Sequence, residues 1–456
     1  MISEANLEKI IKICGKKNVL TDELSRFCYS FDATAKSYLP DIVVFIEDED
    51  QLCELTSFAN ENKIYLTPRG AGTGFSGGAI PIYGGIVLSF ERMNKIIDID
   101  FKNLIAIVEV GVNTYEFKEK LKEYNLFYPP DPASQKISTI GGNVAECAGG
   151  PLGLKYGVTK DYVLGIYAIL PTGDKIKTGV RTKKGVVGYD LTKLLVGSEG
   201  TLAIFTKIIL KLLPLPSSFK TAFIIFKDAA SAANCIPEII KKGILPSTLE
   251  FMDFYSLKCI EDLLNFKLTK FSSALLIELD GDEEILNKKM RKIKDICIKY
   301  KTEEIFLAQS EDERESLWEA RRAISPAISR IFKDKRKVNE DIVVPQSKIP
   351  EILDKLYKIA EKYGYDIVVF GHAGDGNLHV NLMVKKDEKE EKISEAIYEI
   401  FVSTLSLGGS ISGEHGIGFT KSKFIKLEIG EKEYNLMKKM KKIFDPRNIL
   451  NPGKIF

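Results

Sequence analysis

Histidine is scarce in this sequence, and its placement is uneven. The 456-residue chain holds three histidines, His372, His379 and His415, so residues 1–371 contain none. All three stand in or beside glycine-rich segments near the C-terminal end. Imidazole titrates near neutral pH, so scarce histidines kept in glycine-rich loops favour a chemical role over a packing role.

Closely spaced cysteines are also absent. The seven cysteines stand at positions 14, 28, 53, 147, 235, 259 and 297, and no two form a CxxC pair. This spacing argues against an iron–sulfur cluster or a zinc ribbon in the chain. The odd number and wide scatter are typical of reduced cytosolic thiols.

Neither a large net charge nor a long apolar run is present. The 65 basic and 63 acidic residues leave a net charge of +2, which gives no footprint for nucleic acid. No apolar run reaches the roughly 20 residues that span a bilayer, and the N-terminal segment is too polar for a signal peptide. We therefore expect a soluble cytoplasmic protein with no transmembrane segment. Hydrophobic residues at 45% and charged residues at 28% indicate a globular chain of two or three domains.

The pattern of helices, strands and glycines in the first half of the chain predicts a ligand-binding domain over residues 1–216. Residues 1–38 have helical spacing, and an apolar strand at 42–46 follows. A helix and a second strand at 63–66 then lead the chain into a glycine-rich segment at 67–78. Further strands are predicted at 86–90, 104–110, 163–170 and 201–212, with a helix near 114–124.

The second half predicts an antiparallel sheet backed by helices, because strands and helices alternate after Pro214 and Pro216. Strands are predicted at 219–226, 247–251, 273–280, 303–307, 338–344, 365–370 and 378–384. Helices are predicted near 228–241, 284–300, 311–330, 347–362 and 387–406. We place this second domain at 217–410 and expect residues 411–456 to return to the first domain, which makes the fold class α+β.

The glycine-rich segment 68–78 has the composition of a diphosphate loop. It holds five glycines, which let backbone N–H groups approach an anion, together with Arg69, Thr73 and Ser76 as further donors. The residues after it contain Pro81 and are predicted to form a strand, so the nicotinamide-type GxGxxG fingerprint is disfavoured. A glycine-rich hairpin without a ligand remains an alternative.

The histidines have the composition of a metal site. His372 and His379 are seven positions apart in a segment interrupted by glycines, which lets the two rings converge. Glu414 and His415 follow in Ser-Gly-Glu-His-Gly. Two neutral histidines and a carboxylate suit Zn²⁺, Mn²⁺ or Fe²⁺. The alternative is a pair of hydrogen-bonded loop histidines.

Three motifs in this order resemble one family. They are the 68–78 loop, the Pro-Pro-Asp-Pro-Ala-Ser segment with Gly-Gly-Asn after it, and Val-Gly-Ser-Glu-Gly-Thr-Leu at 196–202. The chain is similar, from about residue 38 to its end, to the FAD-dependent D-2-hydroxyacid dehydrogenases of the vanillyl-alcohol-oxidase superfamily. The resemblance implies a two-subdomain FAD-binding domain of that type and an α+β cap domain.

The resemblance also implies where the cofactor lies. Non-covalent FAD is expected, because no histidine precedes residue 372 and Cys147 reads as an ordinary small residue. The implied FAD residues are Pro68, Arg69, Gly70, Ala71, Gly72, Thr73, Gly74, Ser76, Gly77, Asp131, Ser134, Gly141, Gly142, Asn143, Ala148, Gly149, Gly157, Val158, Glu199, Gly200, Ile204 and Asn451.

The catalytic residues implied by the resemblance fit a 2-hydroxy acid. His372, His379 and Glu414 match the metal ligands, and His415 matches the base that takes the hydroxyl proton. Arg321 in Leu-Trp-Glu-Ala-Arg matches the arginine that binds the substrate carboxylate. Ser325 and Asn381 are expected to border the substrate, and Arg322 is expected at the surface.

The expected reaction is oxidation of D-lactate to pyruvate, because no second basic pocket for a distal carboxylate is evident in the sequence. Electrons must then leave the chain, and an electron-transferring flavoprotein is the favoured acceptor, ahead of a quinone or an iron–sulfur subunit. A homodimer is the candidate assembly. Glycolate and D-2-hydroxyglutarate dehydrogenases, an alkylglycerone-phosphate synthase and a non-catalytic flavin-binding subunit are the alternatives.

Overall fold

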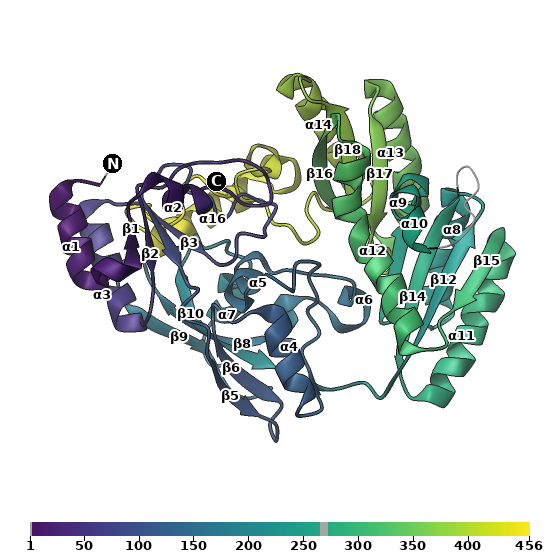
Figure 1. Cartoon of the computed structure of the whole chain (residues 1–456), viewed down its shortest axis with the longest axis horizontal. Helices are drawn as coiled ribbons and strands as arrows, with labels where there is room; N and C mark the ends of the chain where they lie inside the picture. The colour runs from purple at the N-terminus through teal and green to yellow at the C-terminus, as the bar shows by residue number, and fades with distance from the viewer. Residues whose placement is uncertain (1, 265–271) are drawn as a thin grey trace. The chain divides into compact units, whose positions relative to one another are not determined.

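The chain forms two compact units in a computed structural model that describes residues 2–264 and 272–456 (Figure 1). The first unit comprises Met1–Ala148, Val158–Leu215 and Glu414–Phe456, and the second comprises Gly149–Gly157 and Pro216–Gly413. Both units contain helices and sheets, so the predicted α+β class is confirmed. The short excursion 149–157 into the second unit was not predicted.

This excursion is fixed by one buried carboxylate. Lys155 and Tyr156 both bind the side chain of Asp280, which lies on a strand of the second unit. A buried acid needs such partners, because an unpaired charge in the interior is costly. The polar contacts of Asp280 therefore hold residues 149–157 in the second unit.

The first unit begins with a four-stranded sheet of order β1-β2-β4-β3. Its parallel strands are β2 (Ile42–Phe45), β4 (Ile86–Ser89) and β3 (Leu66–Arg69); β2 and β4 are mainly apolar, and β3 ends in the buried Arg69. Helix α3 (Glu49–Asn62) connects β2 to β3, starts at the capping side chain of Asp48 and buries the face that carries Leu52 and Leu55.

The N-terminal segment differs from the predicted run of helix. Helix α1 (Glu4–Cys14) ends at Gly15, whose φ of +80° interrupts the helical backbone. Strand β1 (Val19–Leu20) then pairs with β2, and α2 (Glu23–Cys28) is short. A glycine directly after the last apolar position of a helix can adopt a positive φ. Such a glycine is the sequence signal for the end of this helix.

A five-stranded antiparallel sheet of order β5-β6-β10-β8-β9 completes the first unit. Its edge strands β5 and β9 were not predicted, because their residues alternate with exposed charged side chains. The remaining elements of this unit are β5 (Ile96–Asp100), β6 (Ile105–Glu109), α4 (Thr114–Lys122), β7 (Leu126–Phe127), α5 (Ile140–Glu146), β8 (Val163–Ile169), β9 (Lys175–Gly179), α7 (Leu191–Leu195), β10 (Ile204–Lys211), β11 (Leu213–Pro214), α15 (Ile425–Glu428) and α16 (Glu431–Phe444).

The second unit is built on a seven-stranded antiparallel sheet of order β15-β12-β14-β13-β17-β18-β16, as the strand–helix alternation predicted. Its strands are β12 (Ser218–Phe226), β13 (Thr248–Met252), β14 (Ser273–Gly281), β15 (Thr302–Leu307), β16 (Lys335–Val343), β17 (Asp366–Gly371) and β18 (Asn377–Lys385). Its helices are α6 (Gly153–Tyr156), α8 (Ala229–Lys241), α9 (Phe254–Cys259), α10 (Glu261–Leu264), α11 (Glu283–Cys297), α12 (Glu311–Ile331), α13 (Ile349–Tyr363) and α14 (Glu390–Ser406).

One face of this sheet packs against α12 and α9. Met252 of β13, Leu276 of β14 and Phe370 of β17 share a buried core with Trp318 and Ile324 of α12. Because strand side chains alternate between the faces, every second residue of β13 and β14 points toward α12. That face also receives two buried acids, Glu250 and Glu278.

Glu278 makes four polar contacts, three with α12 and one with Thr221 of the neighbouring strand β12. Its carboxylate accepts from both Nε (2.7 Å) and Nη2 (3.0 Å) of Arg314, from Nε1 of Trp318 (2.9 Å) and from Oγ1 of Thr221 (2.7 Å). The acid is 2% exposed, so these donors replace water. Glu278 is therefore a structural anchor for α12.

Glu278→Gln should destabilise the second unit by about 3 kcal/mol, because the guanidinium of Arg314 would lose its buried counter-charge and keep only the exposed carboxylate of Glu311. Trp318 is the only tryptophan in the chain, and its indole N–H binds Glu278, so its fluorescence reports this unit. Urea unfolding followed by that fluorescence gives the change, and an unaltered midpoint would contradict the anchoring role.

Candidate functional site

The glycine-rich loop of the first unit starts where β3 ends at Arg69. Two of its glycines are sterically required. A Cβ at Gly70 would lie 2.5 Å from Oγ1 of Thr139, and one at Gly72 (φ +68°) would collide with the guanidinium of Arg69. Arg69 is buried and donates to the carbonyl of Ala79 (3.2 Å). The loop therefore approaches its neighbours through bare backbone, as a phosphate-binding loop must.

The C-terminal tail supports this loop from the inside. Nδ2 of Asn451 donates to the carbonyl oxygens of Gly78 and Glu199, both at 2.8 Å. Nζ of Lys454 donates to the carbonyls of Gly77 and Ile80, and burial lowers the pKa of Lys454 to about 8. Asn451 was a predicted cofactor residue. Lys454 was not predicted, although it lies in the same C-terminal Asn-Pro-Gly-Lys segment as Asn451.

Two buried carboxylates flank the segment that carries His415. A Cβ at Gly416 would lie 2.8 Å from Oε2 of Glu146 and 3.0 Å from Oε1 of Glu199, so the chain passes between them only as glycine. Burial, together with the nearby charge of Glu199, raises the pKa of Glu146 well above its usual range. Burial likewise raises the pKa of Glu199 to about 7. Oε1 of Glu199 accepts from the N–H of Ile417 (2.8 Å).

His415 lies against the glycine loop within the first unit. Its ring stacks on that of Phe75, with centroids 4.9 Å apart. The N–H of Phe419 donates to the carbonyl of Ser76 (2.8 Å), which fixes the same segment further on. The first unit thus contains one histidine, so the lack of histidine before residue 372 does not by itself exclude a histidyl-linked flavin.

Several predicted cofactor residues already have protein partners. Oγ of Ser76 donates to Glu146, Nδ2 of Asn143 donates to Oγ1 of Thr114 (2.8 Å), and Asp131 pairs with Lys118 (2.7 Å). Gly149 and Gly157 belong to the excursion in the second unit. The other predicted residues of the first unit remain predictions: Pro68, Ala71, Thr73, Gly74, Ser134, Gly141, Gly142, Ala148, Val158, Gly200 and Ile204.

In the second unit the structure brings His372 and His379 together. His372 follows β17 directly, and His379 lies on β18, which pairs with β17. The ring centroids are 5.2 Å apart at an interplanar angle of 87°, and each ring offers a nitrogen within 4.8 Å of the other. Both side chains are buried, so the sequence-predicted convergence of the two imidazoles is present.

Glu250 binds His372 and was missed by the sequence reasoning. Its Oε1 lies 2.7 Å from Nδ1 of His372, and its Oε2 lies 2.5 Å from Nη2 of Arg321. Although burial by itself raises the pKa of Glu250, His372 and Arg321 lower that pKa to about 2. An acid at the centre of an otherwise apolar strand was the signal that could have identified it.

Arg321 is buried on α12 and faces the histidines. Its guanidinium carbon lies 4.9 Å from the ring centroid of Phe370, and the side chain is 9% exposed. Within residues 2–264 and 272–456, Nε of Arg321 has no hydrogen-bond partner. A buried guanidinium with one donor unused is suited to a carboxylate ligand. Arg322 instead lies at the surface and pairs with Glu315, as expected.

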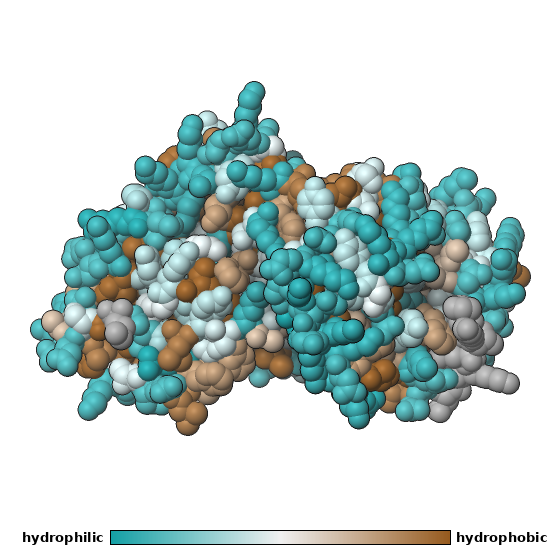
Figure 2. Space-filling view, turned by 90° about the horizontal axis from the view of Figure 1, so that it is seen from above, coloured by the Kyte–Doolittle hydropathy of each residue, from teal (hydrophilic) through white to brown (hydrophobic). Residues whose placement is uncertain are grey.

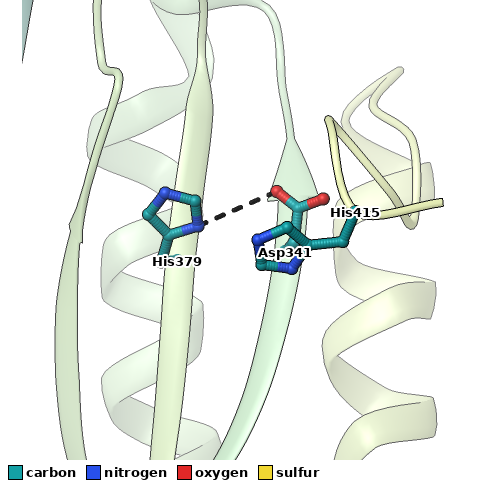
Figure 3. A group of neighbouring side chains, drawn as sticks. All are labelled: Asp341, His379 and His415. Carbon is teal, nitrogen blue, oxygen red and sulfur yellow. Dashed lines mark ion pairs between the residues drawn. The ribbon is translucent and has the colours of Figure 1, made fainter. Parts of the chain in front are cut away.

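Asp341 binds the backbone at Gly413, which is the last residue of the second unit and directly precedes Glu414. Its carboxylate lies 3.9 Å from Nδ1 of His379 (Figure 3) and accepts from the N–H of Gly413 (2.8 Å) and the amide of Asn377. Glu414, the third predicted metal ligand, follows Gly413 directly and opens the segment that returns to the first unit. Sequence reasoning missed Asp341, which is fully buried.

The predicted substrate neighbours have polar partners in the second unit. Ser325 accepts a hydrogen bond from Nζ of Lys337 (3.2 Å), whose pKa burial lowers. Asn381 is wholly buried between Asn339 (2.8 Å) and the carbonyl of Val368 (3.1 Å). Lys337 is a half-buried cation on the α12 side, which the sequence analysis did not identify.

Comparison with known proteins gives two family matches. Residues 40–179 match the family described as FAD binding domain, and residues 215–455 match FAD linked oxidases, C-terminal domain. The chain is 42% identical to the glycolate oxidase subunit GlcD of Bacillus subtilis, over all of this chain and 97% of that protein. It is 33% identical to a D-lactate dehydrogenase of Anaerostipes hadrus, over 98% and 96% of the two chains.

Solved structures show the same fold at low identity. A p-cresol methylhydroxylase superimposes with a TM-score of 0.81 at 18% identity, over 100% of this chain and 97% of that chain. An alkyldihydroxyacetonephosphate synthase superimposes with a TM-score of 0.77 at 19% identity, over 99% and 86%. Among the described residues no helix is both long and apolar enough to span a bilayer, and hydrophilic side chains predominate on the face in Figure 2.

Proposed function

Because the chain belongs to the family of FAD-linked oxidases and has the predicted vanillyl-alcohol-oxidase-type fold, we propose that it is a metal-dependent D-2-hydroxyacid dehydrogenase. D-lactate is the first candidate substrate. The observation that carries the proposal is the buried group of His372, Glu250 and Arg321 in the second unit. It combines an oriented histidine with a guanidinium that can still bind a carboxylate. The similarity to a D-lactate dehydrogenase supports the same reaction class.

The glycine loop, its flanking motifs and Asn451 are proposed to bind FAD without a covalent link. The bare backbone at Gly70 and Gly72 fits a diphosphate that needs close approach. Burial raises the pKa of Cys147, which disfavours the thiolate needed for a cysteinyl link. When bound, FAD supplies the acceptor for the hydride that leaves Cα of the substrate.

His372, His379 and Glu414 are proposed as the ligands of a divalent metal, Zn²⁺, Mn²⁺ or Fe²⁺. The residues fit this role, because a carboxylate on Nδ1 of His372 makes Nε2 the nitrogen with the lone pair. Asp341 fixes the backbone at Gly413, directly before Glu414. When bound, the metal supplies Lewis-acid polarisation of the substrate hydroxyl.

The remaining roles belong to Arg321 and His415. Nε and the remaining N–H groups of the Arg321 guanidinium would bind the substrate carboxylate. This contact would orient the Cα atom of the substrate. His415, placed by its stacking on Phe75, would accept the hydroxyl proton while the hydride leaves Cα. Ser325 and Asn381 would border the substrate.

Lys337 favours a second candidate substrate. A half-buried ammonium beside Ser325 could bind a distal carboxylate, which D-2-hydroxyglutarate has and D-lactate lacks. Glycolate is a third candidate, supported by the similarity to a glycolate oxidase subunit. The absence of a second basic pocket, on which the preference for D-lactate relied, is therefore no longer a strong argument.

The electrons of the reduced cofactor are proposed to pass to an external acceptor. The seven cysteines lack iron–sulfur spacing. An electron-transferring flavoprotein is the proposed acceptor, with a quinone or an iron–sulfur subunit as the alternative. A homodimer is the proposed assembly.

Anaerobic mixing of the FAD-loaded, Mn²⁺-supplemented enzyme with single 2-hydroxy acids tests the function. D-lactate should bleach the flavin absorbance faster than glycolate, D-2-hydroxyglutarate or L-lactate. Lys337→Met distinguishes the candidates, because it should slow reduction by D-2-hydroxyglutarate alone if the ammonium binds a distal carboxylate. A flavin that none of these acids reduces would refute the dehydrogenase proposal.

His415→Asn should slow flavin reduction by about 10²–10⁴-fold, which is the usual effect of removing a positioned general base. Metal content should stay near that of the parent, since His372, His379 and Glu414 remain. Rates are compared at matched FAD and metal content, and a metal-replete variant that reacts at the parental rate would show that the proton goes elsewhere.

A further inference from the structure

Glu250 occupies the centre of the second unit and contacts two residues with different proposed tasks. It lies in the middle of β13 with none of its side chain exposed. One carboxylate oxygen meets His372, a proposed metal ligand, and the other meets Arg321, the proposed substrate anchor. Building on the proposed function, we propose that Glu250 is a positioning residue that holds the metal-binding histidine and the substrate-binding arginine in one fixed arrangement.

The first half of the argument concerns the histidine. A ring nitrogen 2.7 Å from a buried carboxylate oxygen is best satisfied as an N–H donor. With Nδ1 as the donor to Glu250, the lone pair of the neutral imidazole lies on Nε2, which is the nitrogen that a metal would use. The same hydrogen bond prevents the ring from flipping and makes Nε2 a better ligand.

The second half concerns the arginine. Nη2 of Arg321 lies 2.5 Å from Oε2 of Glu250, and the ring of Phe370 packs against the guanidinium. These two contacts restrict the plane of the guanidinium and leave Nε without a hydrogen-bond partner among the described residues. A restricted guanidinium binds a carboxylate with little further loss of side-chain entropy.

Both tasks depend on the charge and on both oxygens of Glu250. Arg321 is buried and needs a counter-charge when no substrate is present. A glutamine at 250 would keep one acceptor but would present an NH₂ group either to His372 or to Arg321. Since each of these partners is a donor in this arrangement, the amide must oppose one of them.

Glu278 offers a matched control in the same sheet. It is also a buried glutamate, it lies on the neighbouring strand β14, and it pairs with an arginine of α12, namely Arg314. It contacts Trp318 and Thr221 rather than a histidine. Glu278→Gln therefore removes a buried charge of the same kind without touching the proposed metal ligands.

The test compares the FAD-loaded parent, Glu250→Gln and Glu278→Gln. Mn²⁺ affinity is measured by calorimetric titration of metal-stripped holoenzyme. KM and kcat are measured anaerobically with an artificial dye and the 2-hydroxy acid that reduces the parental flavin fastest. Glu250→Gln should weaken Mn²⁺ binding by about 10–100-fold and raise KM by about 10-fold or more, with a smaller loss in kcat at saturating Mn²⁺. Glu278→Gln should leave Mn²⁺ affinity at the parental value, and its KM should rise less than that of Glu250→Gln, because Arg321 keeps its own contact with Glu250.

Glu250→Asp provides a second variant in case the amide prevents folding. It keeps the charge but shortens the side chain, so Mn²⁺ affinity and KM should fall between those of the parent and Glu250→Gln. Trp318 fluorescence in urea confirms that each variant is folded under the assay conditions.

Each outcome has a distinct meaning. Parental Mn²⁺ affinity or parental KM in Glu250→Gln would overturn the dual role, as would equal losses in Glu278→Gln. A parent that reduces its flavin with a 2-hydroxy acid but binds no Mn²⁺, Zn²⁺ or Fe²⁺ would overturn the metal half of the proposed function and this inference with it. A parent that binds Mn²⁺ yet reduces its flavin with no 2-hydroxy acid overturns the proposed function, while the Mn²⁺ titrations still decide the histidine half of the inference.

Discussion

Two buried carboxylates on neighbouring strands determine where helix α12 lies on the sheet of the second unit. Glu278 binds Arg314 and Trp318, and Glu250 binds Arg321. The three α12 residues are four and three positions apart, so they lie along one face of the helix. Because a buried charge must be paired, the helix cannot slide along the sheet without breaking both sets of contacts. The position of the candidate substrate anchor therefore follows from the packing of the whole unit.

A related requirement, that buried polar groups form hydrogen bonds, operates around the glycine loop of the first unit. Lys454 and Asn451 donate to the carbonyls of Gly77 and Gly78 in that loop, and Glu199 accepts from the N–H of Ile417 just beyond His415. Gly416 allows the chain to pass between Glu146 and Glu199. The C-terminal tail and the segment that carries His415 therefore both form hydrogen bonds with the loop that is predicted to bind the diphosphate.

Much of this arrangement was predictable from periodicity and motifs. The alternation of strand and helix segments after Pro216 predicted all seven strands of the second unit, and the glycines of 371–376 predicted that His372 and His379 could converge. These features are local, because a strand's alternation and a loop's glycines are decided by a few neighbouring residues. Helix breaks were less visible, and Gly15 ended the first helix where the apolar spacing alone suggested continuation.

The residues that support the site were not predictable in the same way. Glu250, Asp341, Lys337 and Lys454 belong to no recognisable motif. The role of each charged side chain depends on a partner that lies on a different element. Thr248, Glu250 and Met252 alternate onto one face of their strand, so a charge inside a buried run was a usable signal. Its partner Arg321 lies 71 positions away, and only the folded sheet and α12 bring the two together.

The central claim is that substrate oxidation needs a metal held by the histidine cluster. The most direct measurement is anaerobic flavin reduction by D-lactate, or by the acid that the parent prefers, in FAD-loaded enzyme before and after removal of divalent metal. The account predicts that reduction is lost in the metal-free enzyme and restored by Mn²⁺ or Zn²⁺, while FAD stays bound throughout. Reduction at the full rate in demonstrably metal-free enzyme would contradict it.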